Sequence, residues 1–195
     1  MRRSSRSQRL GCYLLAELER RGKRRSCRRI CEVGVETGGS VAPLIEAIQP
    51  EVSLLVDHWE PYSTSTDQID RHGDRRRSLA RMRSVAARLG YLPGIIIAKA
   101  ESRIIGELLR EGTFDLVFID GGHTYAVVKS DLKLYWPCVR PGGTFAGHDY
   151  SYLQNRRRGH GVKQAVDEFV AEQGLTMSEL EKRIWWIDKP RDYIS

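Results

Sequence analysis

Two short segments of the sequence place acids beside histidines at spacings that could do chemistry. Each segment directly follows an apolar run that is expected to be a strand. The residues concerned are Asp120, His123, His148 and Asp149. Carboxylates and imidazoles bind divalent metals, and imidazole also accepts protons near neutral pH. The segments therefore predict a centre that binds a metal, moves a proton, or does both.

The metal prediction depends on Asp120, His148 and Asp149, which leave neighbouring strand ends. Two carboxylates with one further donor suit Mg²⁺, which keeps several of its waters. The histidine also admits Mn²⁺ or Fe²⁺. In the alternative interpretation, His148 is a structural hydrogen-bonding residue and Asp149 anchors the loop that follows it.

His123 lies three residues after Asp120 and is the predicted base. A hydroxyl group is a poor nucleophile until it loses its proton, and an imidazole of pKa about 6.5 can take that proton. A metal nearby would lower the pKa of the hydroxyl and orient it. The alternative is that His123 caps a helix that starts near Thr124.

A glycine-rich turn between Glu32 and Ser40 predicts a cofactor site. It reads E-x-G-x-x-x-G-x-S, with Gly34 and Gly38 as its glycines. Glycines let the backbone turn sharply, and the next helix offers N–H groups to an anion. An acid before the first glycine repels a pyrophosphate but suits an ammonium group. S-adenosylmethionine carries an ammonium, a carboxylate and a sulfonium, and therefore fits this turn.

Asp57 ends the next expected strand, 23 residues after Gly34. An acid at this place in a nucleotide-binding fold binds ribose hydroxyls. The combination of the turn, Asp57 and Asp120 indicates a nucleoside cofactor more strongly than the turn alone. The alternative is a tight turn with two surface acids.

The elements that position these residues follow from the spacing of apolar side chains. Short β-branched runs alternate five times with helical stretches, which is typical of parallel strands covered on both faces. The expected strands are 30–35, 52–57, a fully buried 95–98, 114–119 and one from 144, with closing strands 175–180 and 183–187. The expected helices are 8–21, 38–48, 68–89, 102–111, 124–135 and 161–172. The sequence therefore predicts an α/β fold, a single doubly wound Rossmann-like domain.

Ligands of such sheets bind at the carboxyl ends of the strands, near the switch in strand order. The candidate residues follow expected strands, so we expect them to share one edge. We divide the chain into a basic tail with the N-terminal helix, 1–27, and a main domain, 28–195. On the last strand Trp185 and Trp186 alternate, so one is expected in the core and the other at an interface.

The composition limits the class of protein. The chain has 195 residues, 41% of them hydrophobic and 29% charged, which excludes disorder and a disulfide scaffold for the whole chain. No apolar run approaches the ~18–20 residues that cross a bilayer, and no signal peptide is evident, so a cytoplasmic protein is expected. The four cysteines lack C-x-x-C spacing and are expected to be reduced.

The net charge of +7 raises the question of nucleic acid. Arginines gather in residues 2–29, 71–88 and 156–158. No aromatic residues alternate with them, so a base-stacking surface is not indicated. Solvated helix faces and a loose tail are the preferred interpretation, and a nucleic-acid partner is not expected.

Five segments carry a family resemblance: Glu32–Ser40, Val56–Trp59, Phe114–Tyr125, Pro141–Tyr150 and Gly161–Phe169. Together they resemble class I S-adenosylmethionine-dependent methyltransferases. Within that class they resemble the small bacterial family of macrocin O-methyltransferase and related sugar O-methyltransferases. The specific part is FIDGxHxY followed by PGG…HDY, and the resemblance covers about residues 28 to 190.

The resemblance implies a mostly parallel seven-stranded sheet with a C-terminal antiparallel hairpin and an extra N-terminal helix. The family's cofactor residues fall on Glu32, Gly34, Ser40, Asp57, Glu101 and Ser102, with His58 along the adenine; Gly38 and Asp120 complete the predicted cofactor site. A histidine at the place of His123 is the family's proposed base, so His123 and Asp120 are the predicted catalytic residues. The family's metal residues fall on Asp120, His148 and Asp149, although several relatives have an acid in place of His148.

Three functions compete on this basis. The first is an O-methyltransferase, assisted by Mg²⁺ or Mn²⁺, that acts on a hydroxyl of a sugar or natural product. The second is a cofactor-binding partner or assembly protein of a biosynthetic enzyme, since the cephalosporin 7α-hydroxylation component belongs to the same group. The third, a nucleic-acid methyltransferase, is disfavoured because no D/N-P-P-Y/W motif is present.

A homodimer is also expected. Leu10, Leu14 and Leu18 form an apolar stripe on the N-terminal helix, which lies outside the minimal fold. Exposed apolar stripes usually meet a partner or the rest of the chain. The resembled family also forms oligomers.

Overall fold

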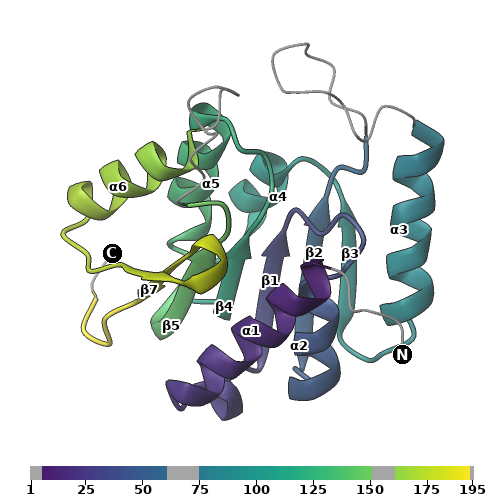
Figure 1. The fold of residues 1–195 in the computed structure, drawn as a ribbon, viewed down its shortest axis with the longest axis horizontal. Helices are drawn as coiled ribbons and strands as arrows, with labels where there is room; N and C mark the ends of the chain where they lie inside the picture. The colour runs from purple at the N-terminus through teal and green to yellow at the C-terminus, as the bar shows by residue number, and fades with distance from the viewer. Residues whose placement is uncertain (1–5, 61–74, 151–160, 194–195) are drawn as a thin grey trace.

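A computed structural model describes residues 6–60, 75–150 and 161–193. Its helices are α1 (Arg6–Arg20), α2 (Val41–Ile48), α3 (Arg75–Leu89), α4 (Ser102–Leu108), α5 (Tyr125–Tyr135) and α6 (Val162–Glu172). Its strands are β1 (Arg29–Val33), β2 (Val52–Asp57), β3 (Ile95–Lys99), β4 (Phe114–Ile119), β5 (Val139–Gly147), β6 (Ser178–Leu180) and β7 (Ile184–Asp188). Strands and helices alternate along the chain as predicted (Figure 1). No helix in these ranges is long and apolar enough to span a membrane.

The seven strands form one sheet in the order β3-β2-β1-β4-β5-β7-β6. Strands β1 to β5 are parallel, whereas β7 pairs antiparallel with both β5 and β6. This arrangement confirms the doubly wound α/β fold with a C-terminal antiparallel hairpin. The strand order reverses between β1 and β4, so the ligand edge predicted from the sequence lies at their carboxyl ends.

The helix α1 packs on the sheet and covers its own apolar stripe. Leu10, Leu14 and Leu18 are all buried, and they contact side chains of β4 and β7 such as Phe118 and Trp186. Figure 1 shows α1 lying in front of the strands beside α2. The stripe that motivated the dimer prediction is therefore not exposed, and that argument from α1 was wrong. A helix outside the minimal fold had an intramolecular partner.

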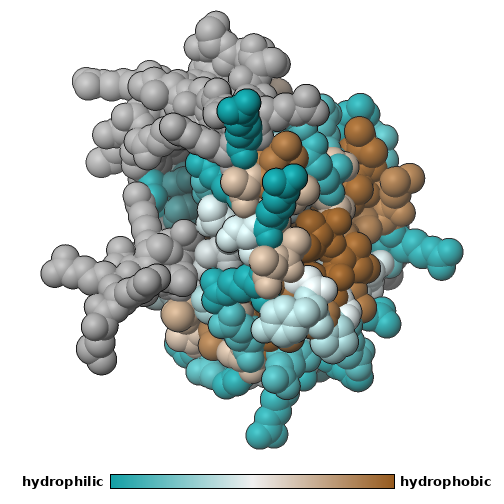
Figure 2. All heavy atoms as spheres, turned by 90° about the vertical axis from the view of Figure 1, so that its right-hand side faces the viewer, coloured by the Kyte–Doolittle hydropathy of each residue, from teal (hydrophilic) through white to brown (hydrophobic). Residues whose placement is uncertain are grey.

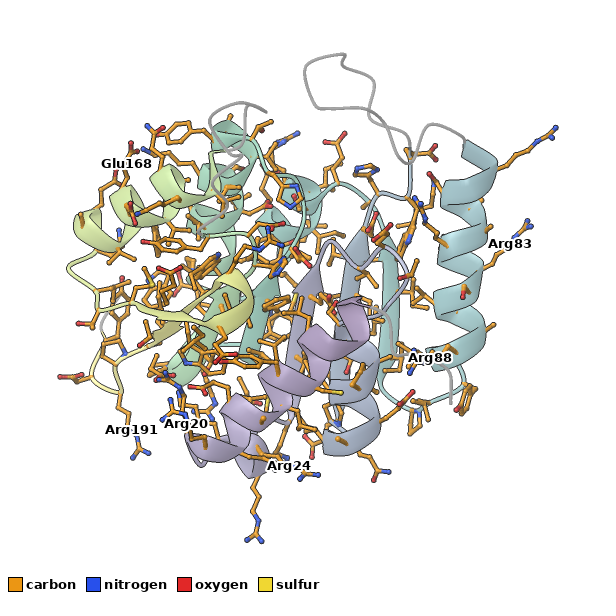
Figure 3. All side chains as sticks on the ribbon, in the orientation of Figure 1. Arg20, Arg24, Arg83, Arg88, Glu168 and Arg191 are labelled. Atoms are coloured by element: carbon orange, nitrogen blue, oxygen red, sulfur yellow. The ribbon has the colours of Figure 1, made fainter. Side chains whose placement is uncertain are left out.

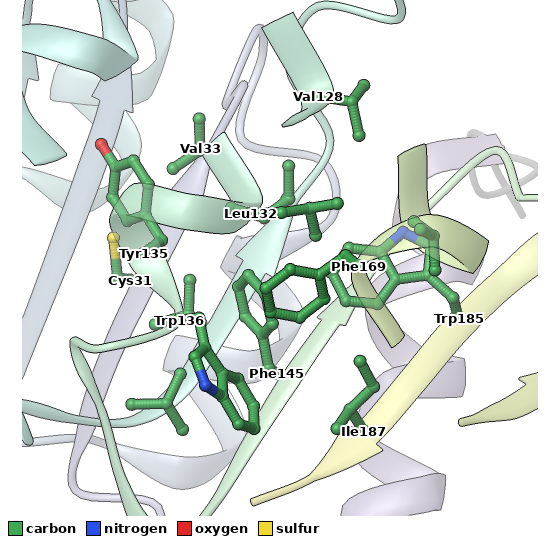
Figure 4. Packing of buried hydrophobic residues seen from close by; sticks show 14 of the residues in the cluster. Cys31, Val33, Val128, Leu132, Tyr135, Trp136, Phe145, Phe169, Trp185 and Ile187 are labelled. Carbon is green, nitrogen blue, oxygen red and sulfur yellow. The ribbon is translucent and has the colours of Figure 1, made fainter. Parts of the chain in front are cut away.

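The opposite face carries the largest core, beneath α4, α5 and α6. Aromatic rings of α5, β5, α6 and β7 meet there in tilted and edge-to-face contacts, with ring centres 5.1–6.2 Å apart (Figure 4). They are Trp136, Phe145, Phe169 and Trp185. The prediction for the tryptophan pair was wrong in part. Trp185 and Trp186 are each 1% exposed, because β7 is covered on both faces.

Two further strand predictions need correction. Strand β3 is not fully buried: it is an edge strand, and Ile96 is 53% exposed. The continuous apolar run is typical of an interior strand, although Ile95 and Ile97 pack under α3 on one face while Ile96 on the other face stays largely exposed. The segment Pro141-Gly142-Gly143, expected as a turn, lies inside β5 at a register shift against β4. The longer β5 begins at Val139 rather than near 144.

Candidate active site

The carboxyl ends of β1 and β4 meet where the strand order reverses. Gly34 follows β1 with a φ of 90°, and a Cβ there would lie 2.3 Å from the backbone oxygen of Asp120. Glycine is required by both the conformation and the close approach. The first turn and the start of the chemical centre are thus in direct contact, as the shared edge predicted.

Glu32 is a buried acid at the end of β1, only 1% exposed. Its Oε1 accepts a hydrogen bond from the Ser40 hydroxyl, while Oε2 is buried without a hydrogen-bond partner among the described residues. Burial, with the charges of Asp120 and Asp57, raises the pKa of Glu32 well above its ordinary value. A cationic group beside Oε2 would relieve this penalty, because a buried charge needs a partner.

Asp57 ends β2, as predicted, and joins two loops. Its Oδ2 accepts the N–H of Glu36 at 2.8 Å, and its Oδ1 accepts the N–H of Trp59 at 2.7 Å. The Trp59 indole closes the loop by donating to the Glu36 carbonyl at 2.9 Å. Each carboxylate oxygen has a second lone pair, so the half-buried Asp57 can still accept from ligand hydroxyls.

The residues predicted for the adenine side lie at the ends of β2 and β3. His58 Nδ1 accepts the N–H of Glu60 at 2.8 Å, and Glu101 is exposed at the N-cap position of α4. Ser102 directs its hydroxyl away from solvent, to Oδ1 of Asp131 at 2.6 Å. The side chains of His58 and Ser102 therefore help to shape the loops at this end of the sheet.

Asp131, which the sequence reasoning missed, is 1% exposed on α5. Burial raises the pKa of its carboxyl to about 6, against the opposing effect of the Ser102 hydrogen bond. Its Oδ2 has no hydrogen-bond partner within the described part of the chain. The signal in the sequence was an acid in an otherwise apolar stripe of a helix, since Val128, Leu132 and Tyr135 around it are buried.

The predicted chemical centre does assemble. Asp120, His123 and Asp149 each offer a ligand atom, and these atoms lie within 4.8 Å of one another. His123 Nε2 is 2.9 Å from Asp149 Oδ2. His148 lies beside them, with Nδ1 at 3.4 Å from both Asp120 Oδ1 and Asp149 Oδ2. The compact three-residue cluster thus contains His123 where the sequence reasoning placed His148.

The charges of this centre are strongly coupled. Burial disfavours a charged His148, but Asp120 and Asp149 outweigh it and raise its pKa to about 9. Burial also disfavours a charged His123, but the Asp149 contact and the charges of Asp149 and Asp120 together outweigh it and raise the pKa of His123. Both histidines hold the pKa of Asp149 far below its usual range, despite burial.

Arg183 is a second residue that the sequence reasoning missed. Its guanidinium NH1 lies 2.7 Å from Asp149 Oδ1. It precedes β7, more than thirty residues after the motif that contains Asp149, and nothing in its local sequence marks it. Arg183 thus holds Asp149 through Oδ1, while Oδ2 of the same carboxylate contacts His123.

A scan of protein families finds a match over residues 31–150, more than half of the chain, to a family described as a methyltransferase domain. The chain belongs to this methyltransferase family. The resemblance to class I S-adenosylmethionine-dependent methyltransferases is thereby confirmed. The comparison with curated proteins found no match.

Solved structures with the same fold include methyltransferases of low sequence identity. A putative caffeoyl-CoA O-methyltransferase from Staphylococcus aureus is 13% identical, with a TM-score of 0.63 over 90% of this chain and 83% of that one. A methyltransferase from Podospora anserina, solved with S-adenosylhomocysteine, is 15% identical, with a TM-score of 0.62 over 92% and 77%. The O-methyltransferase NovP is 16% identical, with a TM-score of 0.63 over 94% and 80%. At these identities the similarity shows the shared fold.

The site fits the cofactor of this class. The buried Oε2 of Glu32 can accept from an ammonium, and Gly34 provides a turn without a side chain. Asp57 lies 23 residues after Gly34 along the chain, at the neighbouring strand end, with acceptor capacity left for hydroxyls. These groups have the chemistry that the amino-acid end and the ribose of S-adenosylmethionine require.

Proposed function

We propose that this methyltransferase transfers the methyl group of S-adenosylmethionine to a hydroxyl of a small molecule, such as a sugar or natural product, with assistance from a divalent metal. The observation that carries this proposal is the His123–Asp149 pair, 2.9 Å apart, at the same strand edge as the cofactor turn. An oxygen acceptor needs a base, whereas the sulfonium is already an activated methyl donor.

The cofactor residues would be Glu32, Gly34, Gly38, Ser40 and Asp57, with His58, Glu101, Ser102 and Asp120 around them. Glu32 would meet the ammonium, and Ser40 orients the Glu32 carboxylate by donating to Oε1. Asp57 would accept from the ribose hydroxyls. When bound, the cofactor supplies the methyl group on a positively charged sulfur.

His123 is proposed to receive the proton of the acceptor hydroxyl. Asp149, whose Oδ2 lies 2.9 Å from Nε2, would accept the hydrogen of Nε2, fix the ring and leave the neutral tautomer with its basic lone pair on Nδ1. As the ring gains a proton at Nδ1, the Asp149 carboxylate stabilises the resulting imidazolium. Positioning of the hydroxyl against the methyl group supplies the remainder of the rate enhancement.

Asp120 and Asp149 would hold the metal through their carboxylates, and His148, whose Nδ1 lies 3.4 Å from an oxygen of each, would be the imidazole ligand. His123 lies in the same cluster, with its ligand atom within 4.8 Å of those of both acids, and keeps its lone pair for the proton. The ion would supply Lewis acidity that lowers the pKa of a bound hydroxyl. Mg²⁺ or Mn²⁺ suits two carboxylates and one imidazole.

The arginine-rich surfaces do not favour a nucleic-acid substrate. Figure 3 shows Arg83 pointing outward from α3, away from the sheet. Arg88 pairs with Glu46 at 2.7 Å, and Arg24 pairs with Glu19, so part of this charge is neutralised locally. A small-molecule acceptor remains the proposal.

The test is a methyl-transfer assay with labelled S-adenosylmethionine on a panel of hydroxylated sugars and natural products, with and without EDTA. Turnover that falls in EDTA and returns with Mg²⁺ or Mn²⁺ supports the whole proposal. Cofactor binding without turnover on any acceptor would instead favour a cofactor-binding partner of another enzyme. Methylation of nucleic acid in preference to the panel would overturn the acceptor class.

We also propose that the chain forms a homodimer, through the open face at β3 and α4 rather than through α1. Parallel sheets are normally covered on both faces, yet Ile96, Ile104 and Leu108 are 53%, 45% and 75% exposed. Ile96 lies two residues before Ala98 and therefore on the same face of β3, the face that α4 packs against. Figure 2 looks onto this side of the molecule and shows apolar side chains gathered on one part of it.

Charge complementarity favours a second copy as the occupant of this face. Arg103 and Glu107 are exposed beside Ile104 and Leu108 on α4 and pair with each other at 2.8 Å. An antiparallel pair of α4 helices would bring the apolar side chains together and place each Arg103–Glu107 pair against the opposite charges of the other copy. Light scattering should give a dimer mass at micromolar concentration for wild type and a monomer for Leu108→Lys. A dimer in both would place the interface elsewhere, and a wild-type monomer would exclude it.

A further inference from the structure

Arg183 joins the C-terminal hairpin to the chemical centre. Its guanidinium NH1 is 2.7 Å from Asp149 Oδ1, and the two side chains are only 19% and 16% exposed. The pair is thus largely shielded from solvent, where a charge-assisted hydrogen bond is stronger than at the surface.

The backbone holds the same two places together. Arg183 and Asp149 both have left-handed conformations, with φ of 65° and 60°, which non-glycine residues seldom adopt. The next residue, Tyr150, donates its N–H to the Arg183 carbonyl at 3.0 Å. Main chain and side chain therefore both fix the hairpin against the end of β5.

The contact determines how the Asp149 carboxylate is used. Arg183 engages Oδ1, and Oδ2 lies 2.9 Å from His123 Nε2 and 3.4 Å from His148 Nδ1. With Oδ1 held from one side, Oδ2 is the oxygen that faces the histidines. Arg183 thus acts on His123 through Asp149.

The contact also places a permanent positive charge at the metal cluster. A guanidinium stays protonated throughout the accessible pH range. A divalent ion on Asp149 would share this carboxylate with Arg183, and like charges at such short range repel strongly at reduced dielectric. The cluster that could hold a metal therefore has its affinity reduced by a cation of the chain itself.

We propose that Arg183 is a positioning residue of this centre: it orients Asp149 toward His123 and, as a fixed cation, weakens the hold of the Asp120 and Asp149 carboxylates on a divalent metal. This inference rests on the metal site of the proposed function, but it requires neither the acceptor nor turnover. It predicts that removal of Arg183 tightens metal binding, which loss of a merely structural contact would not do.

The test measures Mn²⁺ binding by electron paramagnetic resonance on the full chain. Arg183→Gln should bind Mn²⁺ about tenfold more tightly than wild type, and Arg183→Lys, which keeps the charge, should stay within about twofold of wild type. Adding Asp149→Asn to Arg183→Gln should abolish the gain. The matched control is Arg88→Gln, which removes an arginine from an ion pair with Glu46 on the surface of α3 (Figure 3) and should leave Mn²⁺ affinity unchanged.

A second measurement reports on orientation. The ¹⁵N shifts of His123 should show the Nε2 hydrogen bond in wild type and Arg183→Lys, and its loss in Arg183→Gln. If Arg183→Gln does not fold, Arg183→Gly replaces it, because glycine adopts the φ of 65° without strain. Equal or weaker Mn²⁺ binding in the folded variant overturns the inference. Absence of Mn²⁺ binding in every variant overturns it together with the metal part of the proposed function, whereas S-adenosylhomocysteine binding, measured by calorimetry, tests the cofactor part separately.

Discussion

The cofactor side and the chemical centre treat their acids in opposite ways. Glu32 is buried with an oxygen that has no partner in the described part of the chain, and its pKa is raised well above the ordinary value. Asp149 is half-buried at the same edge of the sheet. Arg183 and His123 both contact its carboxylate, and its pKa is far below the usual range. The first region is incomplete without a cationic ligand, and the second is balanced by the chain's own charges.

This difference indicates how affinity and chemistry are divided. An uncompensated buried carboxylate lowers stability until a cation meets it, so the energy of the ligand's ammonium can be converted into affinity. A compensated carboxylate is already oriented and needs little reorganisation during a reaction. Substitutions on the two sides should therefore separate binding from turnover.

The largest expected effect is on the chemical side. His123→Ala should lower turnover about 10²–10⁴-fold and leave S-adenosylhomocysteine affinity within about twofold. The wild-type rate should rise with pH as His123 loses its proton, with a midpoint above the ordinary 6.5 because Asp149 raises the pKa of His123. The variant should lack this limb. His58→Ala is the matched control, and it should affect cofactor binding more than turnover at saturation; an active His123→Ala would refute the assignment.

The next effect is on the cofactor side. Asp57→Ala should weaken S-adenosylmethionine binding at least tenfold, since hydrogen bonds to a charged acceptor contribute about 1.5–3 kcal/mol. Part of the loss comes from the loop, because the N–H groups of Glu36 and Trp59 lose their acceptor. Titration calorimetry measures the change, with the exposed Glu46→Ala as control. Asp149→Ala should lose Mn²⁺ but keep the cofactor, and the reverse pattern would show that the two regions are not separable.

A smaller effect is expected for Glu32→Gln, which should raise thermal stability and lower cofactor affinity. The folded pKa of Glu32 is raised, so its contribution to stability is present below 4.5 and lost as pH rises through the folded pKa. At neutral pH the neutral amide should therefore raise Tm, by about 2–4 °C if the gain is about 1 kcal/mol. Cofactor affinity should fall about tenfold at the same time, because an ionised acceptor is lost. A variant that lost stability as well as affinity would show that the buried Glu32 carboxyl does not lower the stability of the free protein.

A last effect, on stability, concerns Asp131, a buried acid that lies outside both regions. Its pKa is raised from 3.8 to about 6, so the stability it contributes is complete below pH 3.8 and is lost as pH rises through about 6. Asp131→Asn should remove this loss, up to about 3 kcal/mol, and flatten the dependence of unfolding free energy on pH across that window. Urea unfolding at pH 4 and pH 7 measures the difference. If the unfolding free energies of variant and wild type changed equally between pH 4 and pH 7, the pH dependence would come from a group other than Asp131.

The sequence predicted the sheet and the ends of its central strands well, because period and strand length are local properties. Strands β2 and β4 begin and end where the apolar runs do. It failed at Ile96, since an apolar run does not reveal whether a strand lies at the edge of a sheet. It failed again for α1, because the partner of its stripe includes Trp186, far along the chain.

The candidate site divides in the same way. Asp120 and His123 lie in one motif and were predicted together. Asp149 was predicted beside them because the carboxyl ends of neighbouring parallel strands share one edge of the sheet. Arg183 was not predictable, because its role depends on a three-dimensional contact and a left-handed backbone that no motif records. Asp57 lies where predicted, although its hydrogen bonds to two loop N–H groups depend on how those loops fold back.

The packing of α1 has a consequence for synthesis on the ribosome. Leu10, Leu14 and Leu18 are translated more than 160 residues before Ile184 and Trp186, which complete the cluster around them. Until β7 has emerged, the apolar face of α1 therefore lacks part of its cover and is open to chaperones or to other nascent chains. Contacts between such distant segments also form slowly, because a long loop must close before they form. The packing of α1 is thus completed only once β7 has been translated.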